Sequence, residues 1–470
     1  MKILRVTVRL FLWGLGISAS LAAVAAPAGK PNIILMLCDD LGYRDVACFG
    51  DTRYQTPNVD RLAKEGFKLT QFYSASAVCT PTRASVITGK YPLRFDIRAV
   101  FQDTGQTLPP CPTLPKTLQA AGYRTAHVGK WHLGGVRLKD CAMRDKSPGP
   151  REHGFDHYLT QIEEQPKRGE MIKARTLYRQ GGTCLLRDDK QVDKTDPYFP
   201  MHFTDLMAEE SMRLIRQFQA EGKPFFLNLW WMVPHTPLEP SQEPFWSQTA
   251  APGISDAQHC FRSMVVHMDF QIGRILKLLD DLKITDNTLV VFTSDNGGAA
   301  EANIGELKGG TTDLHEGGIR VPFIARWPGR INQGKEHTTP GISVDLFPTF
   351  CAAAGVPMPA GEKFDGINLL PLLAGQTAML ERSTLFWQLN LMKNIQRHYP
   401  KPMPYATEVA RKGRWKLLAF EGKPVELFDI ESDVREEKNL VAEKPELVES
   451  LRQELAVWLA EPRTPFLKIP

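Results

Sequence analysis

Short apolar runs alternate with helical patterns along most of the chain from residue 32 onward. Each run is rich in β-branched or aromatic residues and is bounded by polar residues, which is typical of buried strands. The clearest runs are residues 32–38, 123–129, 224–231 and 288–294. This alternation predicts an α/β fold in which a large, mostly parallel sheet is sandwiched by helices.

Two helices are predicted from spacing and end signals. Apolar residues recur every three or four positions from Phe261 to Leu282, which places them on one helix face. A shorter helix is expected to begin at Pro57, with Thr56 as its N-cap, and to stop at Gly66.

The C-terminal part has a different pattern. The periodicity loosens over residues 365–376, and strand-like segments follow at 384–389, 414–420 and 425–430. A final helix is expected to carry a stripe of Leu447, Leu451, Leu455 and Trp458. We predict a large domain over residues 29–380 and a smaller α+β subdomain over 381–470.

The first 28 residues have the pattern of a cleaved signal peptide. Basic Lys2, Arg5 and Arg9 precede an apolar run over 10–24 and a small-residue cleavage site. A permanent membrane anchor is the alternative, but the run is shorter than the roughly 18 residues that a span needs. We expect export to the periplasm or the extracellular space, with no stable membrane anchor.

Charge and cysteine content exclude several classes of protein. The chain has 57 Lys and Arg against 53 Asp and Glu, and the signal peptide carries three of the four net positive charges. No nucleic-acid partner is therefore expected. The eight cysteines include no Cys-x-x-Cys pair, which argues against a thiolate zinc site.

Polar residues follow each predicted strand. The carboxyl ends of parallel strands meet at one edge of a sheet, where ligands bind. The residues predicted at this edge are Asp39, Asp40, Lys130, His132, His235, Asp295 and Asn296.

The acidic members of this set predict a metal site. Adjacent carboxylates repel one another unless a cation neutralises them. Asp39, Asp40 and Asp295, with the Asn296 carbonyl, offer oxygen ligands only, which favours calcium or magnesium over zinc. A lone Asp-Asp pair is usually a turn or a helix cap, so the prediction depends on their joint placement.

Cys79 is predicted to lie just before a helix. Thr80 is expected as the N-cap, Pro81 as the first helical residue and Gly89 as the end. The N-terminus of a helix attracts anions, and Arg83 one turn later adds a cation. The alternative is a structural cysteine beside a surface arginine.

These motifs resemble those of the type I sulfatases, formylglycine-dependent hydrolases of the alkaline-phosphatase superfamily. The resemblance covers about residues 31–460 and is closest to the arylsulfatase and N-acetylgalactosamine-6-sulfatase branch. The motifs that carry it are PNIILMLCDDLGY, TPNVDRLAKEG, CTPTR with ASVITGKYPLR, GYRTAHVGKWHLG, PHTP, TSDNGG, EGGIRVPFIARWPG and DLFPTF.

The resemblance implies a role for each residue of the edge. Cys79 matches the cysteine that a formylglycine-generating or sulfatase-maturating enzyme oxidises during export, and Arg83 matches the residue that stabilises the hydrated aldehyde. Lys130 and His132 match sulfate and aldehyde contacts, and His235 matches the general acid for the leaving oxygen. The implied ligands of calcium, with magnesium as the alternative, are Asp39, Asp40, Asp295, Asn296 and the modified Cys79.

The implied reaction is hydrolysis of a sulfate ester on a carbohydrate or aryl substrate. One hydroxyl of the aldehyde hydrate attacks sulfur and displaces the alcohol, and the other then helps to expel sulfate. Serine would lack that second hydroxyl, so turnover would stall after one sulfate transfer. Cationic residues in segment 138–198 would suit an anionic saccharide, but a solvated loop is the expected role for most of them.

One position departs from the family pattern. Where a second sulfate-binding lysine is expected, five residues before Glu316, this chain has Thr311. Lys308 stands three residues earlier, and we expect it either to reach the sulfate or to be a solvated surface residue.

Two other functions stay open from sequence. One is a phosphate or phosphonate monoester hydrolase of the same superfamily, since both oxyanions are tetrahedral. The other is a non-catalytic binder of sulfated glycans in which Cys79 remains a thiol.

Overall fold

The computed structural model describes residues 29–101, 105–136, 146–161, 185–192, 195–198, 201–390 and 406–469. The predicted signal peptide and much of segment 138–198 lie outside these residues. Within them, no helix has the length and apolar character that crossing a membrane requires.

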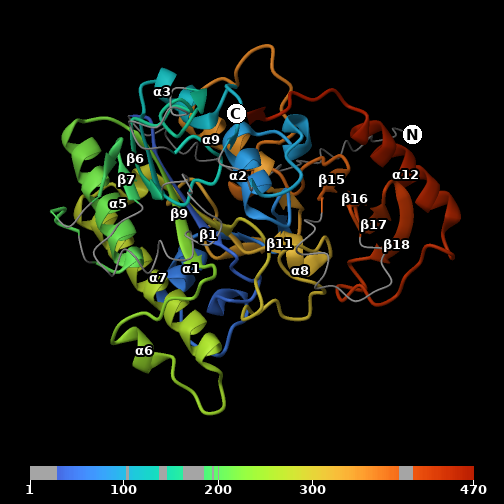
Figure 1. Cartoon of the computed structure of the whole chain (residues 1–470), viewed down its shortest axis with the longest axis horizontal. Helices are drawn as coiled ribbons and strands as arrows, with labels where there is room; N and C mark the ends of the chain where they lie inside the picture. Colours follow the sequence, from blue (N-terminus) through green and yellow to red (C-terminus); the bar gives the residue numbers. More distant parts are fainter. Residues whose placement is uncertain are drawn as a thin grey trace, which may run out of the picture.

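A ten-stranded sheet forms the centre of the molecule (Figure 1). Its five middle strands run parallel, and the strands toward both edges include antiparallel pairs. In spatial order the strands are β13 (Lys335–His337), β2 (Phe67–Leu69), β12 (Phe323–Arg326), β10 (Thr288–Ser294), β1 (Asn32–Asp39), β9 (Phe225–Pro234), β5 (Arg124–Gly129), β6 (His157–Gln161), β7 (Leu185–Arg187) and β8 (Lys190–Gln191).

The continuous apolar runs arise because helices cover both faces of the sheet. In β1, Ile34 and Met36 face one core, whereas Ile33 and Leu35 face the other. Successive side chains of a strand point to opposite faces, so a strand covered on both sides needs apolar residues throughout. The four predicted strands and the α/β fold class are confirmed.

Two layers of helices enclose the sheet (Figure 1). On one face lie α1 (Pro57–Glu65), α5 (Phe203–Ala220) and α7 (Asp256–Asp281). On the other lie α2 (Cys79–Thr88), α3 (Leu114–Ala120) and α9 (Leu346–Ala354). The shorter helices are α6 (Phe245–Gln248), α8 (Glu316–Ile319) and α10 (Leu370–Leu373).

The predicted long helix is α7, and it begins earlier than expected. Ser255 and Gln258 form a capping box at its start, which satisfies N–H groups that would otherwise lack partners. Ile272, Ile275 and Leu279 on the predicted face are fully buried. The amphipathic pattern is therefore confirmed.

A separate antiparallel sheet forms the C-terminal subdomain, with α12 (Pro445–Leu459) packed against it (Figure 1). Its strands are β15 (Leu385–Gln388), β16 (Glu408–Lys412), β17 (Trp415–Phe420) and β18 (Lys423–Asp429). Two small sheets complete the described strands: β11 (Arg320–Val321) with β3 (Phe72–Tyr73) and β14 (Gly341–Ile342), and β4 (Gln106–Thr107) with β19 (Leu467–Lys468).

The predicted start of the Cys79 helix was wrong by two positions. Cys79 is the first residue of α2, and Val78 rather than Thr80 is the N-cap. The Thr80 hydroxyl donates to the His132 carbonyl at 2.9 Å and accepts from the Phe101 N–H at 3.2 Å. All ten residues of α2 are buried, so this hydroxyl binds neighbouring loops instead of capping the helix.

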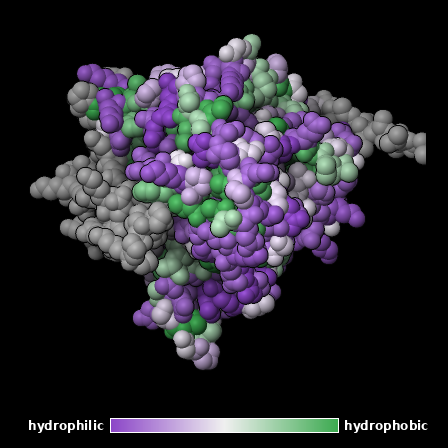
Figure 2. Space-filling model, turned by 90° about the vertical axis from the view of Figure 1, so that its right-hand side faces the viewer, coloured by the Kyte–Doolittle hydropathy of each residue, from purple (hydrophilic) through white to green (hydrophobic). Residues whose placement is uncertain are grey.

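The surface near the C-terminal subdomain is mostly hydrophilic. On the face that Figure 2 presents, apolar residues form small groups among polar ones. Isolated surface apolar residues are normal in soluble domains, so they indicate no binding function by themselves.

Candidate active site

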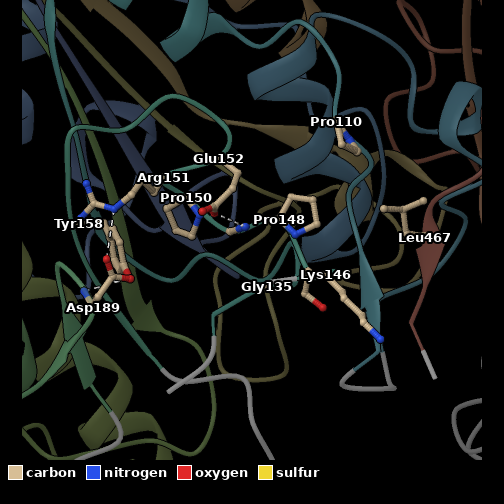
Figure 3. Close-up of a pocket in the computed structure, with 12 residues that line it drawn as sticks. Pro110, Gly135, Lys146, Pro148, Pro150, Arg151, Glu152, Tyr158, Asp189 and Leu467 are labelled. Carbon is tan, nitrogen blue, oxygen red and sulfur yellow. Dashed lines mark hydrogen bonds and ion pairs between the residues drawn. The ribbon is translucent and has the colours of Figure 1, made fainter. Parts of the chain in front are cut away.

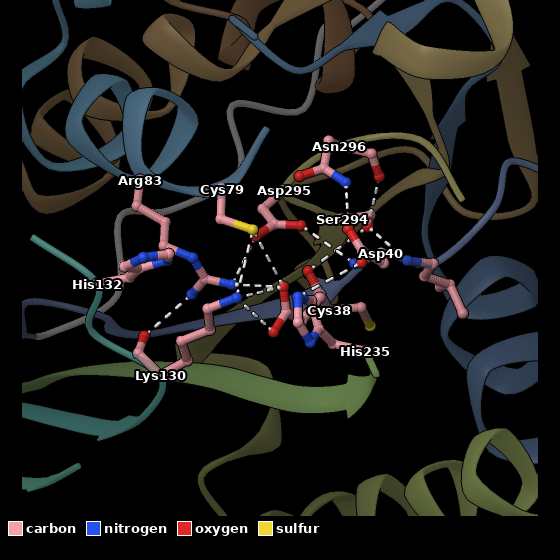
Figure 4. A network of polar contacts seen from close by, with 12 residues as sticks. Cys38, Asp40, Cys79, Arg83, Lys130, His132, His235, Ser294, Asp295 and Asn296 are labelled. Atoms are coloured by element: carbon pink, nitrogen blue, oxygen red, sulfur yellow. Dashed lines mark hydrogen bonds and ion pairs between the residues drawn. The ribbon is translucent and has the colours of Figure 1, made fainter. Parts of the chain in front are cut away.

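Strands β1, β5, β9 and β10 end beside one another and bring the predicted site residues together. β1 lies between β9 and β10, and β5 pairs with the far side of β9. Figure 4 shows the resulting polar network, with Cys79 and Arg83 arriving from α2. The convergence predicted from the strand ends is therefore present.

Three buried carboxylates form the acidic part of the site. Asp39, Asp40 and Asp295 each place an oxygen within 4.8 Å of the others. Burial and the charge of Asp39 raise the pKa of Asp40 to about 6 and that of Asp295 to about 7. Carboxylates that repel one another in this way gain from a divalent cation.

Asn296 completes an oxygen-rich cluster. Its amide Nδ2 donates to Asp40 Oδ1 at 2.6 Å. Its Oδ1 is buried and accepts no hydrogen bond from any residue that the structure describes. An unsatisfied buried amide oxygen beside three carboxylates fits the hard oxygen ligation of calcium or magnesium.

Two cations, one fully buried and one partly buried, face the acidic cluster. Lys130 Nζ donates to both Asp39 oxygens, at 3.0 and 2.9 Å. Arg83, fully buried, donates to Asp295 Oδ2 at 2.6 Å and lies 3.3 Å from Asp39 Oδ1. Burial would lower the pKa of Lys130, but the neighbouring Asp39 carboxylate outweighs this effect and raises it.

Cys79 lies between the acidic cluster and the two cations (Figure 4). Its Sγ is 3.6 Å from Asp39 Oδ1 and accepts from Lys130 Nζ at 3.3 Å. Burial, aided by the nearby carboxylates, raises the pKa of the Cys79 thiol well above its usual value. The thiol therefore stays protonated near neutral pH, which makes it a poor nucleophile in this form.

Two histidines border the site on opposite sides. His132 adopts a left-handed backbone conformation, and its Nδ1 has no hydrogen-bond partner among the described residues. Burial and the charges of Lys130 and Arg83 lower the pKa of His132 well below its usual value. His235 is more accessible, and its Nε2 lies 3.7 Å from Asp40 Oδ2.

Lys308 lies with the C-terminal subdomain rather than with this group. Its Nζ donates to Glu426 Oε1 at 3.4 Å and to the Glu436 carbonyl at 3.3 Å. Thr311 is the residue that reaches the acidic cluster, because its Oγ1 accepts from Asn296 Nδ2 at 3.2 Å. In this structure the Lys308 ammonium group contacts the subdomain and is 40% exposed, and both expected roles of Lys308 stay predictions.

Two features of this region escaped sequence reasoning. The Trp230 ring lies 5.0 Å from the Arg83 guanidinium and forms a cation–π contact beneath it. His202, Asp205 and His267 form a second cluster, with His267 Nε2 at 2.7 Å from Asp205. His202 is the N-cap of α5, and its Nδ1 accepts from the Thr204 N–H at 3.2 Å.

A cavity of about 380 Å³ lies elsewhere on the surface (Figure 3). Arg151 and Asp189 on its wall pair with each other at 3.2 Å. None of the candidate site residues lines it. The catalytic assignment therefore rests on the polar network at the strand ends.

Comparison with known proteins places the chain in a family. The family model described as Sulfatase matches residues 31–356. The chain belongs to the sulfatase family. A second model, described as N-sulphoglucosamine sulphohydrolase, C-terminal, matches residues 312–462 of this sulfatase.

Relatives that match most of the chain support the same family. The sulfatase is 30% identical over 468 residues to steryl-sulfatase of Homo sapiens, covering 83% of this chain and 76% of that protein. It is 34% identical over 385 residues to N-acetylgalactosamine-6-sulfatase of Canis lupus familiaris, covering 76% of this chain and 68% of that protein. The predicted enzyme class is confirmed: the protein hydrolyses sulfate monoesters.

A solved structure shares the fold. The crystal structure of Ps i-CgsB in complex with k-i-k-neocarrahexaose superposes with a TM-score of 0.78 at 28% identity. The match covers 93% of this chain and 94% of that chain. This chain therefore shares its fold with that protein over nearly the whole length of both chains.

Proposed function

We propose that the protein is an exported, calcium-dependent sulfatase in which Cys79 is converted to formylglycine. The observation that carries this proposal is the place of Cys79 Sγ, between Lys130 Nζ at 3.3 Å and Asp39 Oδ1 at 3.6 Å. A protonated thiol there would be a poor nucleophile, whereas the hydrated aldehyde supplies an attacking hydroxyl and a second one that permits release of sulfate.

Asp39, Asp40, Asp295 and Asn296 are the proposed calcium ligands. Their support is the shared 4.8 Å neighbourhood of the three carboxylates and the unsatisfied Asn296 Oδ1. A bound calcium ion would supply positive charge for sulfate and lower the cost of three adjacent carboxylates. Magnesium is the alternative ion, and titration of the purified protein with each ion separates the two.

The cations of the site are proposed to bind and orient the sulfate group. Lys130 and Arg83 carry fixed charge at the start of α2, where negative charge develops during sulfuryl transfer. His235, partly open to solvent, is proposed to protonate the leaving oxygen. His132, kept neutral by its surroundings, is proposed to contact the aldehyde hydrate.

A sulfated carbohydrate is the proposed substrate class. The supporting observations are the N-acetylgalactosamine-6-sulfatase relative and the structural neighbour solved with a neocarrahexaose. The signal-like N-terminus supports export, and formylglycine formation requires a maturating enzyme as a transient partner. We propose the domain limits predicted above, with residues 29–380 as the catalytic domain.

Parallel hydrolysis assays test this function. We expect the mature protein to turn over an aryl sulfate and to act far more slowly on the matching aryl phosphate. Cys79→Ala should abolish turnover, and Cys111→Ser, a half-buried cysteine outside the site, should leave it unchanged. A preference for phosphate would favour the phosphate-hydrolase alternative, and binding of sulfated glycan without turnover would favour the binder.

A further inference from the structure

Residues 308–318, a loop that runs into the short helix α8, contact both the acidic cluster and the segment that carries Cys79. Its Thr311 N–H donates to the Gly298 carbonyl at 3.0 Å, two residues beyond Asn296 in the acidic cluster. Its Thr312 N–H donates to the Ala77 carbonyl at 2.8 Å, two residues before Cys79. The loop therefore ties the segment that carries the proposed metal ligands to the segment that carries the nucleophile.

The backbone of this loop packs tightly against the backbone next to the acidic cluster. The Gly297 N–H donates to the Gly318 carbonyl at 2.9 Å. A Cβ on Gly297 would lie 1.9 Å from the Gly317 carbonyl oxygen, so the two backbones touch directly. A shift of residues 317 and 318 must therefore displace Gly297 and the adjoining Asn296.

The C-terminal subdomain contacts this loop through a buried cluster of ion pairs. Lys416 Nζ, on β17, lies 3.0 Å from Glu316 Oε1 and 2.8 Å from Glu436 Oε1. Glu436 Oε2 accepts from the Glu316 N–H at 2.7 Å. Tyr73 donates to the other Glu316 oxygen at 2.7 Å. Both side chains of each ion pair are fully buried.

Stability alone explains this cluster poorly. Desolvating an ammonium and two carboxylates costs as much as their attraction returns, and apolar residues of similar volume often serve a core equally well. Glu436 also has a φ of 54°, in the left-handed region that non-glycine residues rarely adopt. Such backbone strain at Glu436, whose side chain binds the neighbouring loop, suggests that this residue holds the loop in place.

We propose that Lys416 and Glu436 are positioning residues, through which the C-terminal subdomain sets the geometry of the metal site. They fix Glu316, which fixes the 308–318 loop, and that loop holds Asn296 and Thr311 against Asp40. This inference rests on the proposed function only in taking Asp40 and Asn296 as metal ligands.

The double variant K416M/E436Q tests the proposal without leaving an unpaired lysine charge. We expect the Kd for calcium, measured by isothermal titration calorimetry, to rise about tenfold to a hundredfold, the usual effect of losing residues that orient metal ligands. Hydrogen exchange at the amides of Thr311 and Thr312 should accelerate. The matched control is K412M/E454Q, which removes a more exposed ion pair between β16 and α12.

An unchanged calcium Kd together with unchanged exchange in the loop would overturn the proposal, even if the melting temperature fell. If the double variant does not fold, the same two measurements are made on the single variant E436Q. An unchanged calcium Kd together with unchanged exchange in that variant would overturn the proposal. A parent protein that binds no calcium would refute the proposed metal instead. The exchange of Thr311 and Thr312 would then decide the positioning role alone.

Discussion

His315 should make the stability of this protein depend on pH in the alkaline range. Its Nδ1 lies 2.6 Å from Asp313 Oδ1 and its Nε2 lies 2.9 Å from Glu426 Oε2. The side chain is only 13% exposed. These two carboxylates outweigh the effect of burial and raise the pKa of His315 from 6.5 to about 9.

The size and sign of the effect follow from this shift. A pKa raised on folding stabilises the protein fully below the unfolded-state value, and the contribution is lost as pH rises through the folded-state value. At about 1.4 kcal/mol per pKa unit, the shift from 6.5 to about 9 corresponds to about 3 kcal/mol. The protein should therefore lose this stabilisation as the pH rises from 6.5 to about 9.

Urea unfolding of the parent protein and His315→Gln, followed by tryptophan fluorescence, measures this contribution. Near pH 6 the variant should be less stable by about 3 kcal/mol, and the difference should shrink toward zero above the folded-state pKa. Groups remote from His315 titrate equally in both proteins and cancel in the comparison. A difference that stays constant across the range would refute the reasoning.

Three further outcomes are expected. Cys79→Ser should transfer one sulfate at most and then stop, so steady-state turnover of an aryl sulfate would contradict the role of the second hydroxyl. Calcium at a hundredfold excess over its Kd should raise the free energy of unfolding by about 2.7 kcal/mol, which calorimetry with and without EDTA measures. Ile275→Ala, on the buried face of α7, should cost about 2–5 kcal/mol in urea unfolding while leaving the calcium Kd unchanged.

The sequence was most informative where burial on both faces of the sheet forces continuous apolar runs. Strand β1 is such a run, and its end places Asp39 at the site without any knowledge of distant contacts. The C-terminal strand β16 was missed individually, because Glu408–Lys412 carries charged residues at both ends and reads as polar.

Long-range contacts set the limit of sequence reasoning. Lys308 stands near the position of an expected sulfate ligand, yet Glu426 and the Glu436 carbonyl, more than a hundred residues away, hold its ammonium group. The Lys416–Glu316–Glu436 cluster likewise joins three segments that have no shared local pattern. Such pairs become visible only once the subdomain is placed against the loop.

Mass spectrometry of the peptide that contains Cys79 tests the central claim most directly. The protein should be exported from its native host and analysed without added thiol reagents. The account predicts the mass of an aldehyde, or of its hydrate, at residue 79 in the active protein. An active sulfatase that retained an unmodified thiol at residue 79 would contradict it.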